Sequence, residues 1–164
     1  MGGARAITLA SEAWRGDRSY QVRAAALLAM VKLGAPGARE AVLAALSTPS
    51  YRDAIQNAAI ALVVQRPDSE LVTVLSRELG AQPVPALALT ALTARGNAAA
   101  RAALVRALDD GRSWVREWVL DAVTDQLDAP VAVALLREAT PGLRSPAART
   151  DVNAALDRLE RSPS

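Results

Sequence analysis

Three apolar positions recur four times along the chain, and this repeat constrains the fold more than any other feature of the sequence. Successive copies are separated by 33, 29 and 31 residues in every series. The series are Val22, Ile55, Val84 and Val115; Val42, Leu75, Leu104 and Leu135; and Leu46, Leu79, Leu108 and Ala139. Both halves of the unit place apolar residues at helical spacing, and neither carries a strand pattern. Such a period is typical of stacked helix pairs, so the sequence predicts an all-α fold, a right-handed α-solenoid.

Breakers rich in Gly, Pro, Ser and Asp separate the expected helices. The expected helix pairs span 18–48, 49–80, 81–109 and 110–142, with one helix before them at 4–15 and a closing helix at 145–161. All of these elements belong to a single predicted repeat domain, residues 1–164. Because the helix at 4–15 takes the place of the second helix of a pair, the array begins in mid-repeat. We therefore expect that the chain was, or still is, attached to a segment upstream.

Polar residues at the starts of two first-type helices predict how these helices are capped. Ser19 is the expected N-cap of the helix that follows it. Ser50 with Asp53 three residues later matches a capping box. The central apolar residues of the stripes are expected to be buried. They are Leu27, Leu46, Ile55, Leu75, Leu104, Val115 and Leu135.

The composition excludes several kinds of catalytic site. The chain has no His and no Cys, so the common zinc sites and the Ser-His-Asp and Cys-His arrangements cannot form within it. The adjacent carboxylates Asp109 and Asp110 are expected to form a solvated turn, because Mg²⁺ and Ca²⁺ require more oxygen ligands than this turn offers. We therefore expect no catalytic residue, no cofactor and no metal.

The charge and hydropathy of the chain argue against a nucleic-acid partner and against a membrane location. The formal net charge is +2, with acids interspersed among the arginines, which argues against a nucleic-acid partner. No apolar run reaches the roughly 18 residues that a membrane span needs, and the first residues lack a secretory leader. The expectation is a soluble protein without a membrane partner, cytoplasmic by default.

A spacing of Asp and Arg occurs in two of the four repeats. Asp17 precedes Arg23 by six residues, Asp110 precedes Arg116 by six, and each arginine directly follows a valine. This resembles the HEAT repeat, in a compact form similar to the bacterial kind, in which such residues form a ladder of hydrogen bonds between neighbouring repeats. Gln56 and Pro85 follow the apolar residue in the other two repeats, so any ladder is interrupted there.

A longer set of residues carries a narrower resemblance. The segments are Ser19-Tyr20, 22–27, 48–53, 55–59 and Leu108-Asp109-Asp110 before Val115-Arg116. Over roughly residues 4–160 the chain resembles the C-terminal HEAT-like region of bacterial aminopeptidase N-like gluzincin metallopeptidases. The resemblance implies a helical region that packs on a catalytic domain and shapes access to it. The His-Glu-x-x-His motif of that family has no counterpart here, so zinc and peptidase activity are not implied for this chain.

The leading functional hypothesis is a non-catalytic scaffold that binds a protein surface or a covalently linked upstream domain. Tyr20, Tyr51 and Trp114 occupy matching positions near the starts of first-type helices, and form the candidate interaction surface. An alternative is a nucleic-acid-binding protein similar to HEAT-like DNA glycosylases, in which Trp114, Trp118, Asp121 and nearby arginines would act. A third is an accessory protein similar to HEAT-like bilin lyases, which rests on fold analogy alone.

Overall fold

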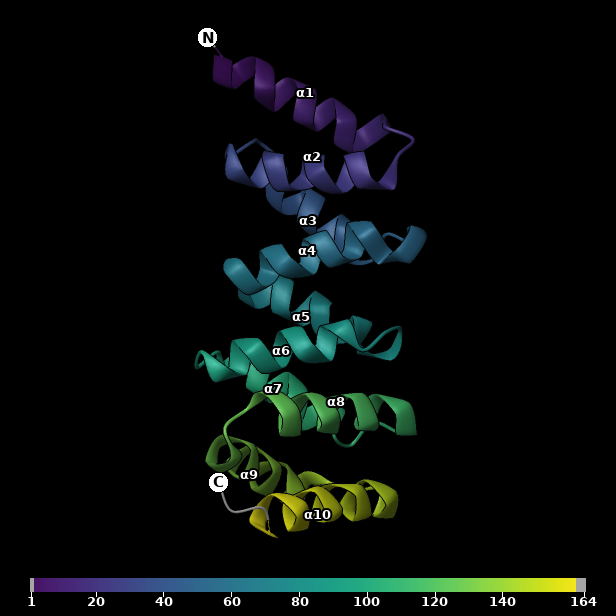
Figure 1. Cartoon of the computed structure of the whole chain (residues 1–164), viewed down its shortest axis with the longest axis vertical. Helices are drawn as coiled ribbons and strands as arrows, with labels where there is room; N and C mark the ends of the chain where they lie inside the picture. Colours follow the sequence, from purple (N-terminus) through teal and green to yellow (C-terminus); the bar gives the residue numbers. More distant parts are fainter. Residues whose placement is uncertain (1, 162–164) are drawn as a thin grey trace. The chain divides into compact units, whose positions relative to one another are not determined.

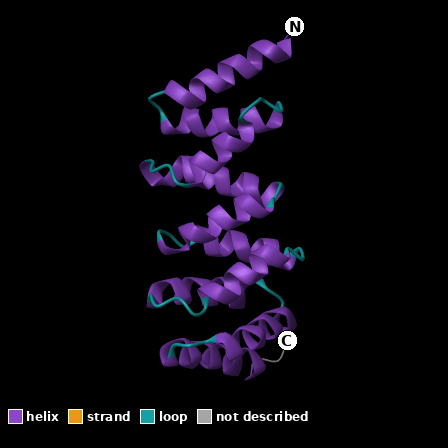
Figure 2. Cartoon of the chain, turned by 180° about the vertical axis from the view of Figure 1, so that it is seen from behind, coloured by secondary structure: helices purple, strands orange, loops and turns teal. Residues whose placement is uncertain are grey.

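The structure is a computed structural model that describes residues 2–161. Over this range it consists of helices joined by turns and loops, with no strand (Figure 2), which confirms the all-α prediction. The chain divides into two compact units, Met1–Val74 and Leu75–Ser164, and the boundary lies inside helix α5.

The first unit is built around helix α2. Its elements are α1 (Gly2–Gly16), α2 (Tyr20–Lys32), α3 (Ala38–Leu46), the 3₁₀ turn η1 (Tyr51–Asp53), α4 (Ala54–Gln65) and the beginning of α5 (Ser69–Arg77). Helix α2 packs against α1, α3 and α4, and α3 also packs against α4 (Figure 1). These contacts bury the apolar stripes of α2, α3 and α4.

The second unit stacks five complete helices. After the end of α5 come η2 (Glu78–Gly80), α6 (Val84–Ala94), α7 (Ala98–Ala107), α8 (Ser113–Gln126), α9 (Ala129–Ala139), η3 (Thr140–Gly142) and α10 (Pro146–Arg161). From α6 onward each helix packs against the next helix and against the one after it. This is the contact pattern expected of helix pairs that bury their apolar faces on neighbouring pairs.

The core agrees with the apolar pattern of the sequence. All seven residues expected to be buried are buried, and both second-helix series, from Val42 to Leu135 and from Leu46 to Ala139, are buried at every position. The first-helix series is less regular, since Val22 is 43% exposed and Val84 is half-buried. The predicted buried positions are therefore right for the second helices, whereas two of the four positions predicted for the first helices, Val22 and Val84, are not buried.

The correction concerns the register of α6. Six of its seven buried residues lie 30 residues after a buried residue of α4 and 30 residues before one of α8; they are Pro85, Ala86, Leu89, Thr90, Leu92 and Thr93, and Ala88 is the exception. The counterpart of Ile55 and Val115 is thus Pro85, and Val84 lies one position too early. Both residues are apolar, so the local pattern cannot separate the two registers. Packing decides in favour of Pro85, because only that register buries the same face in all three helices.

The capping-box prediction at Ser50 and Asp53 is wrong in its geometry. Arg52 and Asp53 both lie in the left-handed backbone region, with φ of 52° and 53°, and α4 begins only after them. The Ser50 hydroxyl oxygen accepts the Ile55 N–H at 3.1 Å, whereas the Asp53 side chain makes no cap bond. By contrast, Ser19 caps α2 as predicted, its hydroxyl oxygen accepting the Val22 N–H at 3.3 Å.

Candidate interaction surfaces

One position of the repeat carries a polar side chain that reaches the end of the preceding helix. The Nε–H of Arg23 donates to the Trp14 carbonyl at 3.0 Å, and its guanidinium lies 5.1 Å from the centre of the Trp14 ring. Trp14 is in the last turn of α1, where carbonyl groups lack helical partners. Arg23 therefore joins α2 to the C-terminal end of α1.

Gln56 and Arg116 occupy the same position in later repeats. The side-chain amide of Gln56 donates to the Leu46 carbonyl, at the end of α3, at 2.6 Å. Arg116 donates to the Asp110 backbone carbonyl at 2.7 Å, and its Nε–H donates to the Asp151 carboxylate of α10 at 3.0 Å. Gln56 and Arg116 are both buried. Glutamine thus makes in the second repeat the contact to a backbone carbonyl that arginine makes in the first and fourth repeats.

These contacts differ from the predicted ladder of Asp17, Arg23, Asp110 and Arg116. The Asp17 carboxylate accepts the Ser19 N–H at 2.8 Å, and the Asp110 carboxylate pairs with Arg112 at 2.8 Å. Within residues 2–161, neither aspartate side chain bonds to the arginine six residues after it. The arginines instead use backbone carbonyls, which a sequence motif does not display. A contact between neighbouring repeats does form, from Arg116 to Asp151.

The structure brings two of the three aromatic residues of the candidate interaction surface together. Tyr20 is 43% exposed and Tyr51 is 68% exposed, and both line a hollow of about 300 Å³ in the first unit. Tyr20 begins α2 and Tyr51 begins η1, which precedes α4. Because residues from the start of α2 and from η1 and the start of α4 line the same hollow, these helix starts lie side by side. Trp114, 46% exposed, belongs to the second unit.

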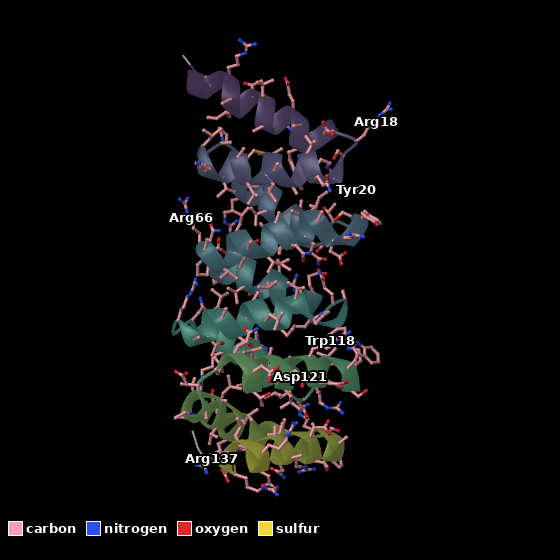
Figure 3. All side chains as sticks on the ribbon, viewed as in Figure 1. Arg18, Tyr20, Arg66, Trp118, Asp121 and Arg137 are labelled. Atoms are coloured by element: carbon pink, nitrogen blue, oxygen red, sulfur yellow. The ribbon has the colours of Figure 1, made fainter. Side chains whose placement is uncertain are left out.

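The residues of the nucleic-acid hypothesis lie on α8. Trp114 and Asp121 are exposed, whereas Trp118 is half-buried; Trp118 and Asp121 are labelled in Figure 3. The arginines nearest to Trp114 are already engaged, because Arg112 pairs with Asp110 and Arg116 with Asp151. Their charges are largely compensated by these carboxylates, so this part of α8 offers phosphate little free positive charge.

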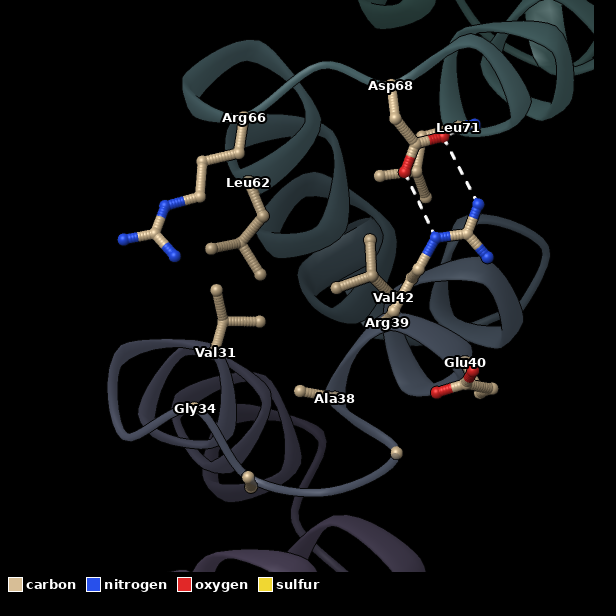
Figure 4. A pocket seen from close by; sticks show the side chains of 12 residues that line it. Val31, Gly34, Ala38, Arg39, Glu40, Val42, Leu62, Arg66, Asp68 and Leu71 are labelled. Atoms are coloured by element: carbon tan, nitrogen blue, oxygen red, sulfur yellow. Dashed lines mark hydrogen bonds and ion pairs between the residues drawn. The ribbon is translucent and has the colours of Figure 1, made fainter.

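A second hollow, of about 380 Å³, lies in the first unit near the C-terminal ends of α2 and α4 (Figure 4). Val31, Val42 and Leu62 contribute apolar side chains to it. Arg39 of α3 forms ion pairs with Asp68 at 3.1 Å and Glu70 at 2.6 Å, and thereby joins α3 to the start of α5. The principal charges of this hollow therefore compensate one another.

Two carboxylates in these hollows and turns accept backbone N–H groups at or just before the starts of helices. Asp68 accepts the N–H groups of Leu71 at 2.9 Å and Glu70 at 3.0 Å, and these bonds, the one from Leu71 first, with Arg39 hold the pKa of Asp68 below its ordinary 3.8. Asp109 accepts the N–H groups of Arg144 and Ser145 at 2.8 and 3.2 Å, which lowers its pKa as well. The Asp109-Asp110 turn thus ties two loops of the second unit together.

Among residues 2–161 no group of three acidic side chains comes close enough together to hold a metal ion. None of the helices that the structure describes combines the length and apolar character needed to cross a membrane.

Comparison with known proteins gives no relative for this chain. No family model matches the sequence, and no curated protein or solved structure is significantly similar to it.

Proposed function

We propose that this protein is a non-catalytic helical-repeat scaffold that binds a partner protein. The observation that carries the proposal is the pair of exposed tyrosines, Tyr20 and Tyr51, that line one hollow at adjacent helix starts. Only 3% of the residues in the chain are aromatic, so two exposed rings in one place are a conspicuous use of them. Tyrosine is enriched among the residues that dominate protein–protein binding energy, because its ring packs while its hydroxyl forms hydrogen bonds.

The finer proposal is that the helix pairs form a right-handed HEAT-like solenoid over residues 1–164. The support is the pattern of contacts between successive helices in the second unit and the shared polar position of Arg23, Gln56 and Arg116. A still finer proposal, supported by the sequence resemblance alone, is that the chain is the C-terminal segment of an aminopeptidase N-like metallopeptidase. A His-Glu-x-x-His motif encoded in frame upstream of Met1 would support it, and an in-frame stop codon there would count against it.

Partner capture tests the binding function. The wild-type protein and a Tyr20→Ser/Tyr51→Ser variant are immobilised, exposed to lysate of the source organism, and the retained proteins are quantified by mass spectrometry. The control is Leu28→Ser/Leu33→Ser, which removes two partly exposed apolar side chains, 41% and 40% exposed, from the same unit. Circular dichroism checks that all three proteins are folded.

The expected result is at least one protein retained by the wild type and the leucine control and lost from the tyrosine variant. A truncated interface tyrosine costs on the order of 2 kcal/mol of binding free energy, or about thirtyfold in affinity, so the loss is measurable. If every retained protein binds the tyrosine variant and the wild type equally, the proposed surface is wrong.

A further inference from the structure

The hollow between Tyr20 and Tyr51 combines positive charge with exposed aromatic rings. Its described lining consists of Arg18, Ser19, Tyr20, Gln21, Tyr51, Arg52 and Ala54, and none of these residues is acidic. Neither the Arg18 nor the Arg52 guanidinium forms an ion pair within residues 2–161. Lys32 and Arg66 also lack an ion pair within residues 2–161 and line another hollow of the first unit, but that hollow has no aromatic side chain. Six other arginines pair with carboxylates: Arg39, Arg101, Arg112, Arg116, Arg137 and Arg161.

The neighbouring carboxylates form no ion pair with either guanidinium within residues 2–161. Asp17 is the acid next to Arg18, and its carboxylate accepts the Ser19 N–H. Asp53 is the acid next to Arg52, and it is half-buried and outside the lining of the hollow. The N-terminal ends of α2 and α4 also lie beside the hollow, and the aligned peptide dipoles of a helix make that end positive.

The backbone holds Arg52 at the hollow in a strained conformation. Arg52 and Asp53 are consecutive left-handed residues other than glycine, and each such residue costs on the order of 1 kcal/mol. The turn that they form places the Arg52 guanidinium 5.3 Å from the centre of the exposed Tyr51 ring. Strain of this kind persists where the surrounding structure imposes it, and it clusters at binding and catalytic sites.

We propose that this hollow, the acidic-segment site, binds a stretch of a partner protein that carries aspartate or glutamate side chains. The guanidinium groups of Arg18 and Arg52 would each bind a carboxylate, since the planar fork of arginine matches its two oxygens. The hydroxyl groups of Tyr20 and Tyr51 supply further donors, and their rings cover the apolar stems of the bound side chains. The proposal rests on the proposed function, because it names the class of partner for the same surface.

The charge distribution favours an acidic protein over a nucleic acid. A nucleic-acid backbone requires a continuous basic track that neutralises successive phosphates. Here two guanidinium groups without ion pairs flank a hollow of only about 300 Å³, and Asp17 and Asp53 lie immediately beside them in the chain. Such a site suits a short acidic segment.

Fluorescence anisotropy with defined probes tests the inference on the full chain. The probe is a labelled peptide, Gly-Asp-Glu-Leu-Asp-Glu-Gly, and its counterpart has the acids replaced by Asn and Gln. The test variant is Arg18→Glu/Arg52→Glu. The matched control is Lys32→Glu/Arg66→Glu, which changes the net charge equally at the other ends of the same two helices; Arg18 and Arg66 lie on opposite sides of the first unit in Figure 3.

The expected result is saturable binding of the acidic peptide, about tenfold or more tighter than that of the amide peptide, and weaker at high salt. The Arg18→Glu/Arg52→Glu variant should lose about tenfold or more in affinity, whereas the control should stay within about twofold. Equal binding of the two peptides, equal losses in both double variants, or no binding at about 1 mM peptide would each overturn the inference.

Two further experiments distinguish the acidic-segment site from a nucleic-acid surface and from the more general protein-binding function. Tighter binding of a ten-residue oligothymidylate than of the acidic peptide would show a nucleic-acid surface and overturn the inference. The second arm is the partner capture described above, repeated with Arg18→Glu/Arg52→Glu. If that variant retains the partners that the tyrosine variant loses, the protein-binding function stands while the acidic-segment site is wrong.

Discussion

One position of the repeat makes the same kind of hydrogen bond with different side chains. It is occupied by Arg23, Gln56 and Arg116. Each donates to a backbone carbonyl at or just after the end of the preceding helix, where no helical N–H is available. In the third repeat Ala86 stands at this position and cannot donate. There the preceding helix ends in the 3₁₀ turn η2, in which the Ala81 N–H donates to the Glu78 carbonyl at 3.0 Å.

Gln56 allows this residue-scale role to be measured. Gln56→Ala leaves the buried Leu46 carbonyl without its 2.6 Å donor, and we expect the free energy of unfolding to fall by about 1–3 kcal/mol. The control is Asn57→Ala at the adjacent, exposed position. Urea denaturation followed by circular dichroism gives both values. Equal losses in the two variants would show that the Gln56 bond contributes nothing specific.

Leu27 and Leu28 provide an adjacent pair with opposite environments. Leu27 is completely buried and Leu28 is 41% exposed. Leu27→Ala should lower the free energy of unfolding by about 2–5 kcal/mol, because it removes buried methyl groups and leaves a cavity. Leu28→Ala should cost within about 0.5 kcal/mol, as is usual at the surface. The same denaturation experiment checks the pair, and a larger loss for Leu28→Ala would place α2 in the wrong register.

The left-handed Arg52 predicts an unusual effect of glycine. Arg52→Gly relieves about 1–2 kcal/mol of backbone strain, while the added flexibility of the unfolded chain costs about 0.5–1 kcal/mol. We therefore expect the variant to be more stable than the wild type by about 0.5–1 kcal/mol. Arg52→Ala removes the same guanidinium but keeps the Cβ, so it should show no gain. Thermal unfolding distinguishes them, and equal stability of the two variants would argue against strain at this residue.

At the scale of elements, Asp109 joins two loops and makes their association depend on pH. It accepts the backbone N–H groups of Arg144 and Ser145, which precede α10, and its pKa in the folded state lies below the ordinary 3.8. A lowered pKa means that the folded state stabilises the ionised carboxylate of Asp109 more than the unfolded chain does. This stabilisation is complete above the ordinary pKa and is lost as the pH falls through the lower, folded-state value.

Asp109→Asn should therefore make the free energy of unfolding depend less steeply on pH in the acid range. Both proteins are denatured with urea at a series of pH values. Below about pH 4 the wild type should lose more stability than the variant, because only the wild type binds a proton at this position on unfolding. The two curves should run parallel above that range. Parallel curves throughout would show that Asp109 is not coupled to folding.

At the scale of the whole molecule, the two units each bury their own apolar residues, and their tryptophans report on them separately. Trp14 belongs to the first unit, and Trp114 and Trp118 belong to the second. In repeat proteins stability is a sum of local terms and terms between neighbours. A substitution in the core of one unit should therefore act mainly on that unit.

Two single-tryptophan proteins test this independence. Trp114→Phe/Trp118→Phe retains Trp14, and Trp14→Phe/Trp114→Phe retains the half-buried Trp118. Adding Leu27→Ala should lower the urea midpoint reported by Trp14 more than the midpoint reported by Trp118, since Leu27 lies in the first unit. Equal shifts would show that the described chain unfolds as one cooperative body.

The helices, and the buried residues of the second helix in each pair, could be predicted from the sequence alone. These features are local, because the 3.6-residue period and the breakers between helices can be read within one helix. The register of α6 required the tertiary structure, since Val84 and Pro85 are both apolar and only packing selects Pro85. The partner of Arg23 also required it, because the acceptor is the Trp14 backbone carbonyl, a group that every residue possesses.

The candidate surface could likewise be predicted from the sequence only in part. The sequence placed Tyr20 and Tyr51 near the starts of two first-type helices, but only the packing of α2 on α4 brings them to one hollow. The left-handed turn at Arg52 and the absence of a carboxylate partner for Arg18 within the described residues were likewise tertiary results. Charge pairing depends on distances between residues far apart in sequence, and these distances exist only once the helices have packed.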